Sequence, residues 1–98
     1  MVFTQEEIKM RVLPIMKQNN IERAILFGSY GKGKATEESD IDLLVKSNLR
    51  GLAFMGFTED IRESLDDKEV DIIDFSEIIP DSPIDREIRL TGVELYAR

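Results

Sequence analysis

The sequence predicts an α/β (α+β) fold, in which helices pack on a small mixed β-sheet. The first observation is that runs with helical apolar spacing alternate with short apolar runs of strand length, in the order α-β-loop-β-α-β-α-β. The second is that residues 28–39, between the first two strands, are too few for a helical crossover between parallel strands. We therefore expect these strands to be antiparallel neighbours.

Length and composition favour a single domain over residues 1–98. This length is enough for one domain but too short for two, and 42% hydrophobic residues are typical of a packed core. The chain has no cysteine and no histidine, which excludes disulfides, thiol catalysis and the commonest metal ligand. Acid–base or metal chemistry must then use carboxylates, which favour the hard cations Mg²⁺, Mn²⁺ and Ca²⁺.

The net charge of -7 is unevenly distributed along the chain. Residues 1–50 hold 8 basic and 7 acidic side chains, whereas residues 51–98 hold 5 and 13. An acidic chain is poorly suited to a phosphate backbone, so no direct nucleic acid binding is expected. The acidic second half is either a solvated face or a surface for a basic protein partner. No apolar run reaches about 18 residues and no signal pattern is present, so we expect a cytoplasmic protein without membrane contact.

The first helix is predicted to begin at Thr4, which forms a capping box with Glu7, and to end at Asn19-Asn20. Pro14 falls inside this helix and should kink it. The buried face has apolar residues at helical spacing: Ile8, Val12, Ile15 and Met16.

Two strands are predicted on either side of a glycine-rich segment. Ile21–Phe27 predicts a strand that ends at Gly28, and residues 28–39 predict a loop with room for one helical turn. Residues 40–45 predict the second strand. Because side chains alternate along a strand, its two faces separate Ile41, Leu43 and Val45 from Asp40, Asp42 and Leu44.

The second half of the chain predicts two helices and two strands. Residues 52–65 predict a helix, and residues 69–74 predict a third strand after a turn. The buried stripe of this helix is Phe54, Phe57, Ile61 and Leu65.

A third helix is predicted to begin at Ser82-Pro83, which has favourable N-cap and first-turn chemistry. Ile84 and Ile88 should be buried, and Gly92 suits a left-handed C-cap. Residues 93–96 predict a short closing strand.

Gly28-Ser29, directly after a buried strand, is the first feature with chemical meaning. Glycine lets a phosphate approach the backbone closely, and a turn that opens a helix presents N–H groups to an anion. The Ser29 hydroxyl adds a donor. The same dipeptide is more often an ordinary turn, so it does not define a site by itself.

Three aspartates on the second and third strands are the second feature. Asp40 and Asp42 share a face with Cα atoms about 6–7 Å apart, and carboxylates that close repel each other unless a cation lies between them. Asp71 lies on the face of the third strand opposite its apolar neighbours and could complete a three-carboxylate cluster. The competing interpretation is ordinary alternation with solvent-facing aspartates. Asp74 falls on the other face, where a structural or solvated role is expected.

Residues 26–45, LFGSYGKGKATEESDIDLLV, contain the pattern Gly-Ser-x10-Asp-x-Asp, and Asp71 adds a third acid on a later strand. This combination resembles the signature of the polymerase-β-like nucleotidyltransferase superfamily, and the local text is similar to its minimal nucleotidyltransferase (MNT) branch. The similarity runs through the leading helix, the VDII strand and the closing EIRLTGVELY.

The resemblance implies a site for a nucleoside triphosphate and two Mg²⁺ ions, with Mn²⁺ as a substitute. In that family the carboxylates that match Asp40, Asp42 and Asp71 hold the ions, and the third also activates the attacking hydroxyl. The residues that match Gly28 and Ser29 contact the phosphates. The implied reaction transfers a nucleoside monophosphate, AMP from ATP, to a hydroxyl acceptor and releases pyrophosphate.

Lys32 and Lys34 are predicted to bind the nucleotide phosphates as point charges. Many relatives have an arginine where Lys32 stands, so bidentate geometry is lost here, and two solvated lysines are an equal alternative. Tyr30 is expected to pack or to contact the base.

The same resemblance implies a partner. MNT proteins are antitoxins of helical HEPN-domain proteins, and some neutralise a HEPN ribonuclease by adding AMP to its tyrosine. The acceptor site is therefore expected on a partner protein or in a homo-oligomer. Two alternatives are a non-catalytic antitoxin that occludes the ribonuclease and an aminoglycoside-type nucleotidyltransferase. The intact set of site residues favours catalysis.

Overall fold

The computed structural model describes residues 2–98, and its four strands form one mixed sheet. The elements are α1 (Gln5–Gln18), β1 (Arg23–Phe27), α2 (Gly28–Gly31), β2 (Ile41–Lys46), α3 (Gly51–Ser64), β3 (Val70–Asp74), the 3-10 helix η1 (Phe75–Glu77), α4 (Pro83–Thr91) and β4 (Val93–Ala97). The strand order is β3-β2-β1-β4. β1 is antiparallel to both β2 and β4, whereas β2 is parallel to β3. The predicted fold class and the antiparallel first pair are confirmed.

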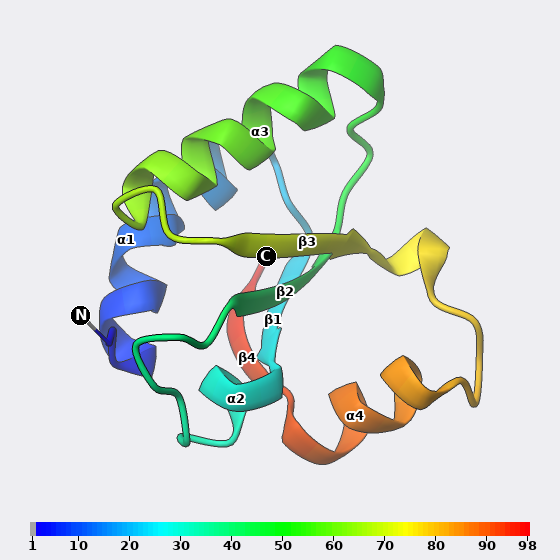
Figure 1. Ribbon diagram of the computed structural model, residues 1–98. Helices are drawn as coiled ribbons and strands as arrows, with labels where there is room; N and C mark the ends of the chain where they lie inside the picture. Colours follow the sequence, from blue (N-terminus) through cyan, green and yellow to red (C-terminus); the bar gives the residue numbers. More distant parts are fainter. Residues whose placement is uncertain (1) are drawn as a thin grey trace.

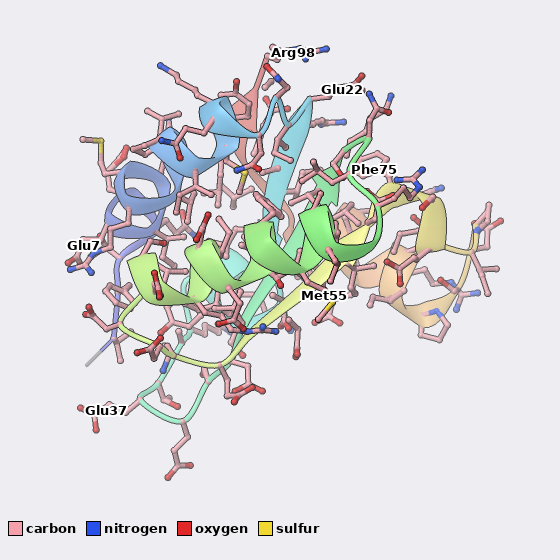
Figure 2. All side chains as sticks on the ribbon, turned by 90° about the horizontal axis from the view of Figure 1, so that it is seen from above. Glu7, Glu22, Glu37, Met55, Phe75 and Arg98 are labelled. Atoms are coloured by element: carbon pink, nitrogen blue, oxygen red, sulfur yellow. The ribbon has the colours of Figure 1, made fainter. Side chains whose placement is uncertain are left out.

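Helices cover the two faces of the sheet unequally. Figure 1 shows α1 and α3 on one side and α4 on the other. The larger core lies beneath α1 and α3, where the predicted stripe of α3 is confirmed, with Phe57, Ile61 and Leu65 fully buried and Phe54 at the margin. The smaller core lies beneath α4 and consists of Ile25, Phe27, Leu44 and Ile88. Met55, in contrast, lies on the outer surface of α3 (Figure 2).

The capping box at the start of α1 is confirmed. Thr4 Oγ1 accepts a hydrogen bond from the Glu7 N–H at 3.0 Å, and Glu7 Oε1 accepts one from the Thr4 N–H at 2.9 Å. α1 continues through Pro14 and ends at the cap residue Asn19. Within residues 2–98, no helix is both long enough and apolar enough to cross a membrane.

The strands begin slightly later than predicted. β1 starts at Arg23, because the Ile21 N–H donates to the Met16 carbonyl at 3.0 Å and so still belongs to the end of α1. β2 starts at Ile41, which leaves Asp40 one residue outside the strand, and β3 starts at Val70. Shifts of one or two residues are common at element ends, where the hydrogen bonding is incomplete.

Asp74 has a structural role, which is one of the two roles expected for it. Its carboxylate accepts hydrogen bonds from the backbone and side chain of Ser76, at 3.0 and 2.6 Å, and from those of Ser47, both at 3.3 Å. Burial acts to raise the pKa of Asp74, but these hydrogen bonds to the charged form hold it below the ordinary 3.8. Asp74 therefore joins the end of β3 to the end of β2.

The prediction of a left-handed C-cap at Gly92 is wrong. Gly92 ends α4 in extended conformation, with φ -64 and ψ 133. Glycine is required here for space, since a Cβ would lie 2.5 Å from the Ile88 carbonyl oxygen and 2.9 Å from Ile25 Cγ2. The predicted start of α4 is confirmed, because Ser82 Oγ accepts a hydrogen bond from the Asp85 N–H.

Two glycine substitutions should have opposite effects on stability. Gly92→Ala should lower the free energy of unfolding by about 1–3 kcal/mol, because the new methyl group overlaps backbone that cannot move freely. Gly56→Ala should raise it by about 0.5–1 kcal/mol, because Gly56 lies inside α3 and a Cβ there meets nothing within 4 Å. Urea titration followed by circular dichroism measures both. Equal effects would contradict the packing described at Gly92.

Candidate active site

Two of the predicted acids lie side by side. The parallel pairing of β2 with β3 places Asp42 in register with Asp71, so both side chains leave the same face of the sheet. Asp42 is also in register with Phe27, the last residue of β1. Because neighbouring strands lie about 4.8 Å apart, the two carboxylates project from adjacent positions on the α4 side of the sheet.

Gly28 lets the turn after β1 approach Asp42. Its φ of +68 lies in the left-handed region, which favours glycine, and α2 supplies the single helical turn that was expected here. A Cβ on Gly28 would collide with Asp42 Oδ2. The Gly-Ser turn and the second aspartate are thus packed directly against each other.

Thr91 joins α4 to the same turn. The Gly28 N–H donates to Thr91 Oγ1 at 3.2 Å, and that hydroxyl donates to the Glu87 carbonyl at 2.7 Å. Gly31 allows α2 to pack closely on the end of α4, since a Cβ on Gly31 would lie 2.5 Å from the Thr91 carbonyl oxygen. The end of α4 is therefore fixed against α2, as the neighbouring positions of the two helices in Figure 1 indicate.

The acids line a hollow of about 450 Å³ that residues of β1, β2, β3, α3 and α4 form together. Three of its lining residues are carboxylates, Asp42, Asp71 and Glu87. Within residues 2–98, none of these three forms an ion pair with a basic side chain. The rest of the wall consists of Phe27, Arg62, Ile72, Ile73 and Ile84.

A larger hollow of about 590 Å³, which Ile88 and Leu44 help to line, differs in its charges. Its two acids are both paired: Asp85 with Arg89 at 3.1 Å and Glu94 with Arg23 at 2.7 Å. Only the smaller of these two hollows therefore presents unpaired carboxylates.

Burial and neighbouring negative charges both act on Asp42. Burial, followed by the negative charges of Asp71, Glu87 and Asp40, raises the pKa of Asp42 from 3.8 to about 6. A donor set of carboxylate oxygens with uncompensated charge fits a hard divalent cation such as Mg²⁺. Within residues 2–98, no three acidic side chains form a complete ligand set by themselves. Mg²⁺ commonly takes one or two carboxylates together with water and phosphate oxygens, so the pair on β2 and β3 suits it.

The other predicted site residues lie at the surface. Ser29 is exposed in the first turn of α2, and Lys32 and Lys34 are exposed in the segment that follows. Asp40 is exposed just before β2 and is not among the residues that line the hollow, although its charge acts on Asp42. Tyr30 packs in the larger core, which is one of the two roles expected for it.

Glu87 and Arg62 line the hollow but were not singled out from the sequence. Arg62 reaches it from α3, where it also contacts the Glu59 carboxylate at 3.4 Å and the Val70 carbonyl at 3.3 Å. Helical spacing could have found Glu87, because it lies three residues after Ile84 and four before Thr91 and so shares their side of α4.

Comparison with known proteins identifies the family. The model of the family described as polymerase beta, nucleotidyltransferase matches residues 11–98. The chain belongs to this family. The enzyme class predicted from the Gly-Ser turn and the aspartates, nucleotidyltransferase, is thereby confirmed.

A relative of known sequence matches most of the chain. A protein of Methanocaldococcus jannaschii, provisionally named a protein adenylyltransferase, is 36% identical over 78 residues, which are 76% of this chain and 81% of that protein.

Solved structures of toxin–antitoxin complexes share the fold. The structure of one such complex with AMP-PNP matches with a TM-score of 0.74 at 22% identity, over 92% of this chain and 73% of that chain. A chain in the structure of a tri-AMPylated Shewanella oneidensis HEPN toxin in complex with MNT antitoxin matches with a TM-score of 0.70 at 20% identity, over 97% of this chain and 74% of that chain. At these identities the likeness establishes the fold alone.

The change in stability caused by substituting Asp42 should depend on pH. Because its pKa is raised to about 6 in the folded chain but is about 3.8 when unfolded, the folded state binds the proton more tightly. Ionisation of Asp42 therefore lowers stability as the pH rises from about 4 to about 6. In buffer without divalent ions, Asp42→Asn should stabilise the chain more at pH 7 than at pH 4, by on the order of 1 kcal/mol after solvent screening.

Urea unfolding of both proteins at the two pH values measures this difference. The same change in stability at pH 4 and pH 7 would show that Asp42 is not held among repelling charges.

Proposed function

We propose that this chain transfers AMP from ATP to a hydroxyl of a partner protein in a Mg²⁺-dependent reaction, as the antitoxin of a HEPN-domain protein. The observation that supports it best is the unpaired Asp42–Asp71 couple on adjacent strands, against the glycine turn. Two like charges in register on adjacent strands cost stability, and chemistry that uses both carboxylates would explain why they are kept.

Asp40, Asp42 and Asp71 would hold two Mg²⁺ ions, or Mn²⁺ in their place. Two such ions, when bound, neutralise the phosphates and stabilise both the attacking and the leaving oxygen of an in-line displacement. Asp42 and Asp71 line the hollow, and Asp40 is exposed just before β2, near enough for its charge to act on Asp42. Asp71 lies on the outer strand of the sheet, β3, where it can accept the proton of an attacking hydroxyl.

In this proposal the turn after β1 binds the phosphates of the nucleotide. Gly28 offers no side chain where the triphosphate and Asp42 must both fit, and the Ser29 hydroxyl is exposed beside it as a donor. The Gly28 N–H is already used by Thr91 and is not a phosphate donor in this arrangement. Lys32 and Lys34 are exposed and would meet the phosphates as point charges.

Two observations support a protein as the acceptor. The curated relative bears the name of a protein adenylyltransferase, and one solved structure of the same fold pairs an MNT antitoxin with an AMPylated HEPN toxin. The acidic second half of the chain would also suit a basic partner surface. The acidic surface favours the alternative function equally, in which the antitoxin only binds and occludes its partner.

AMP transfer to the product of the gene adjacent to that of this chain tests the proposal. With ATP labelled on the α-phosphate and Mg²⁺, the wild-type chain should label the partner. Asp42→Asn should reduce the rate by at least about 100-fold, because an ion and its charge stabilisation are lost. Asp60→Asn, an equal change of charge on the exposed side of α3, should leave the rate unchanged.

A pair of glycine variants gives a second control. Gly28→Ala and Gly33→Ala both place alanine at a positive φ, of +68 and +73, but only the first methyl group collides with Asp42. Loss of transfer in Gly28→Ala alone is expected. An unlabelled partner with wild-type protein, together with full neutralisation by Asp42→Asn, would support the binding-only antitoxin instead.

A further inference from the structure

The outer edge of β3 lies next to the candidate active site. β3 is the last strand in the order β3-β2-β1-β4 and, within residues 2–98, pairs with β2 alone. In Figure 1 it lies in front of the other three strands. It also carries Asp71, which lines the hollow. An edge strand presents N–H and C=O groups that can pair with another chain, and proteins usually close such edges.

The backbone groups of β3 alternate between β2 and the outer edge. The Glu69 carbonyl, just before the strand, accepts a hydrogen bond from the Ile41 N–H of β2 at 3.0 Å. Because the direction of these groups reverses from one residue to the next, Asp71 and Ile73 also turn theirs toward β2. The residues that turn theirs toward the outer edge are Val70, Ile72 and Asp74.

Side chains close this outer edge at both ends. The Val70 carbonyl accepts a hydrogen bond from Arg62 Nη2 at 3.3 Å, and the Asp74 N–H donates one to Glu77 Oε1 at 3.3 Å. Within residues 2–98, no side chain and no loop backbone forms a hydrogen bond with Ile72, which lies between them. The edge is therefore open at a single residue.

The size and charge of this opening restrict what can occupy it. The N–H and C=O of one residue make the two hydrogen bonds of one antiparallel pair, which is too few for a long strand from a second copy of the chain. The exposed side chains beside the opening are acidic: Glu69, Asp71 and Glu77. A short, extended and basic segment fits both conditions.

We propose that β3 binds the acceptor protein through such a segment, which pairs antiparallel with Ile72 and brings its hydroxyl residue opposite Asp71. The inference rests on the proposed function for the protein acceptor and for the proton taken up by Asp71. Residues directly opposite each other on antiparallel strands have Cβ atoms about 4.5–5.5 Å apart. A hydroxyl residue next to the one that pairs with Ile72 would therefore lie beside the Asp71 carboxylate.

This placement determines which hydroxyl reacts. In the transfer, the hydroxyl oxygen forms a bond to the α-phosphorus of ATP while the bond from that phosphorus to pyrophosphate breaks. The hydroxyl proton passes to Asp71. A hydroxyl elsewhere on the acceptor would lack both the strand pairing and the nearby carboxylate.

Hydrogen exchange of single amides, followed by nuclear magnetic resonance, tests the strand pairing without measuring activity. In the free chain the Ile72 amide should exchange faster than those of Asp71 and Ile73, which bond to β2. In complex with the product of the adjacent gene, exchange at Ile72 should slow by at least about 10-fold. Unchanged exchange at Ile72, in a complex that transfers AMP, would overturn this inference and leave the proposed function intact. Absence of transfer by the wild-type pair would overturn both.

Two substitutions test the same edge by kinetics. Ile72→Pro removes the outward N–H but leaves the bonds to β2, and it should lower kcat/KM for the acceptor by about 5- to 10-fold. Glu69→Lys, at an exposed position that keeps the backbone unchanged, should raise the KM for the acceptor because it repels a basic segment. Glu63→Lys makes the same change of charge on the exposed surface of α3 and should leave that KM unchanged. Urea unfolding checks that each variant folds, and wild-type kinetics in a folded Ile72→Pro or in Glu69→Lys would overturn the proposal.

Discussion

The parallel register of β2 and β3 places Asp42 and Asp71 at the same level on one face of the sheet. Burial, followed by the negative charge of Asp71 on the adjacent strand, raises the pKa of Asp42 to about 6, because both disfavour its charged form. The neighbouring features follow from this placement. Gly28 must lack a side chain because Asp42 Oδ2 occupies the space, and the Gly28 N–H then binds α4 through Thr91. The result is a hollow that a divalent cation would stabilise.

Two aspartates of the same strand illustrate how position decides the role of a carboxylate. Asp71 and Asp74 are three residues apart and so lie on opposite faces of β3. Asp74 is buried and accepts four hydrogen bonds, which lower its pKa and stabilise the charged form. Asp71 is exposed and has no ion pair within residues 2–98. The first connects strand ends, and the second is available for chemistry.

The sequence predicted what depends on local spacing. The period of 3.6 located the helices, alternation separated Asp42 and Asp71 from the apolar face, and the short segment after Gly28 required antiparallel strands. It failed where tertiary contacts decide. Gly92 avoids a clash with Ile25 on another element, and the place of Glu87 in the wall of the hollow depends on how α4 is docked. The roles assigned to the predicted site residues came from resemblance to a family, since geometry alone names no substrate.

The central claim is that Asp42 and Asp71 together hold a divalent cation at the glycine turn. The most direct measurement is anomalous diffraction from crystals of the protein grown with Mn²⁺ and a non-hydrolysable ATP analogue. We expect an anomalous peak within ligating distance of both carboxylates, with the analogue's phosphates against Gly28 and Ser29. A well-ordered nucleotide with its Mn²⁺ held elsewhere, and with Asp42 and Asp71 bound to neither, would contradict the account.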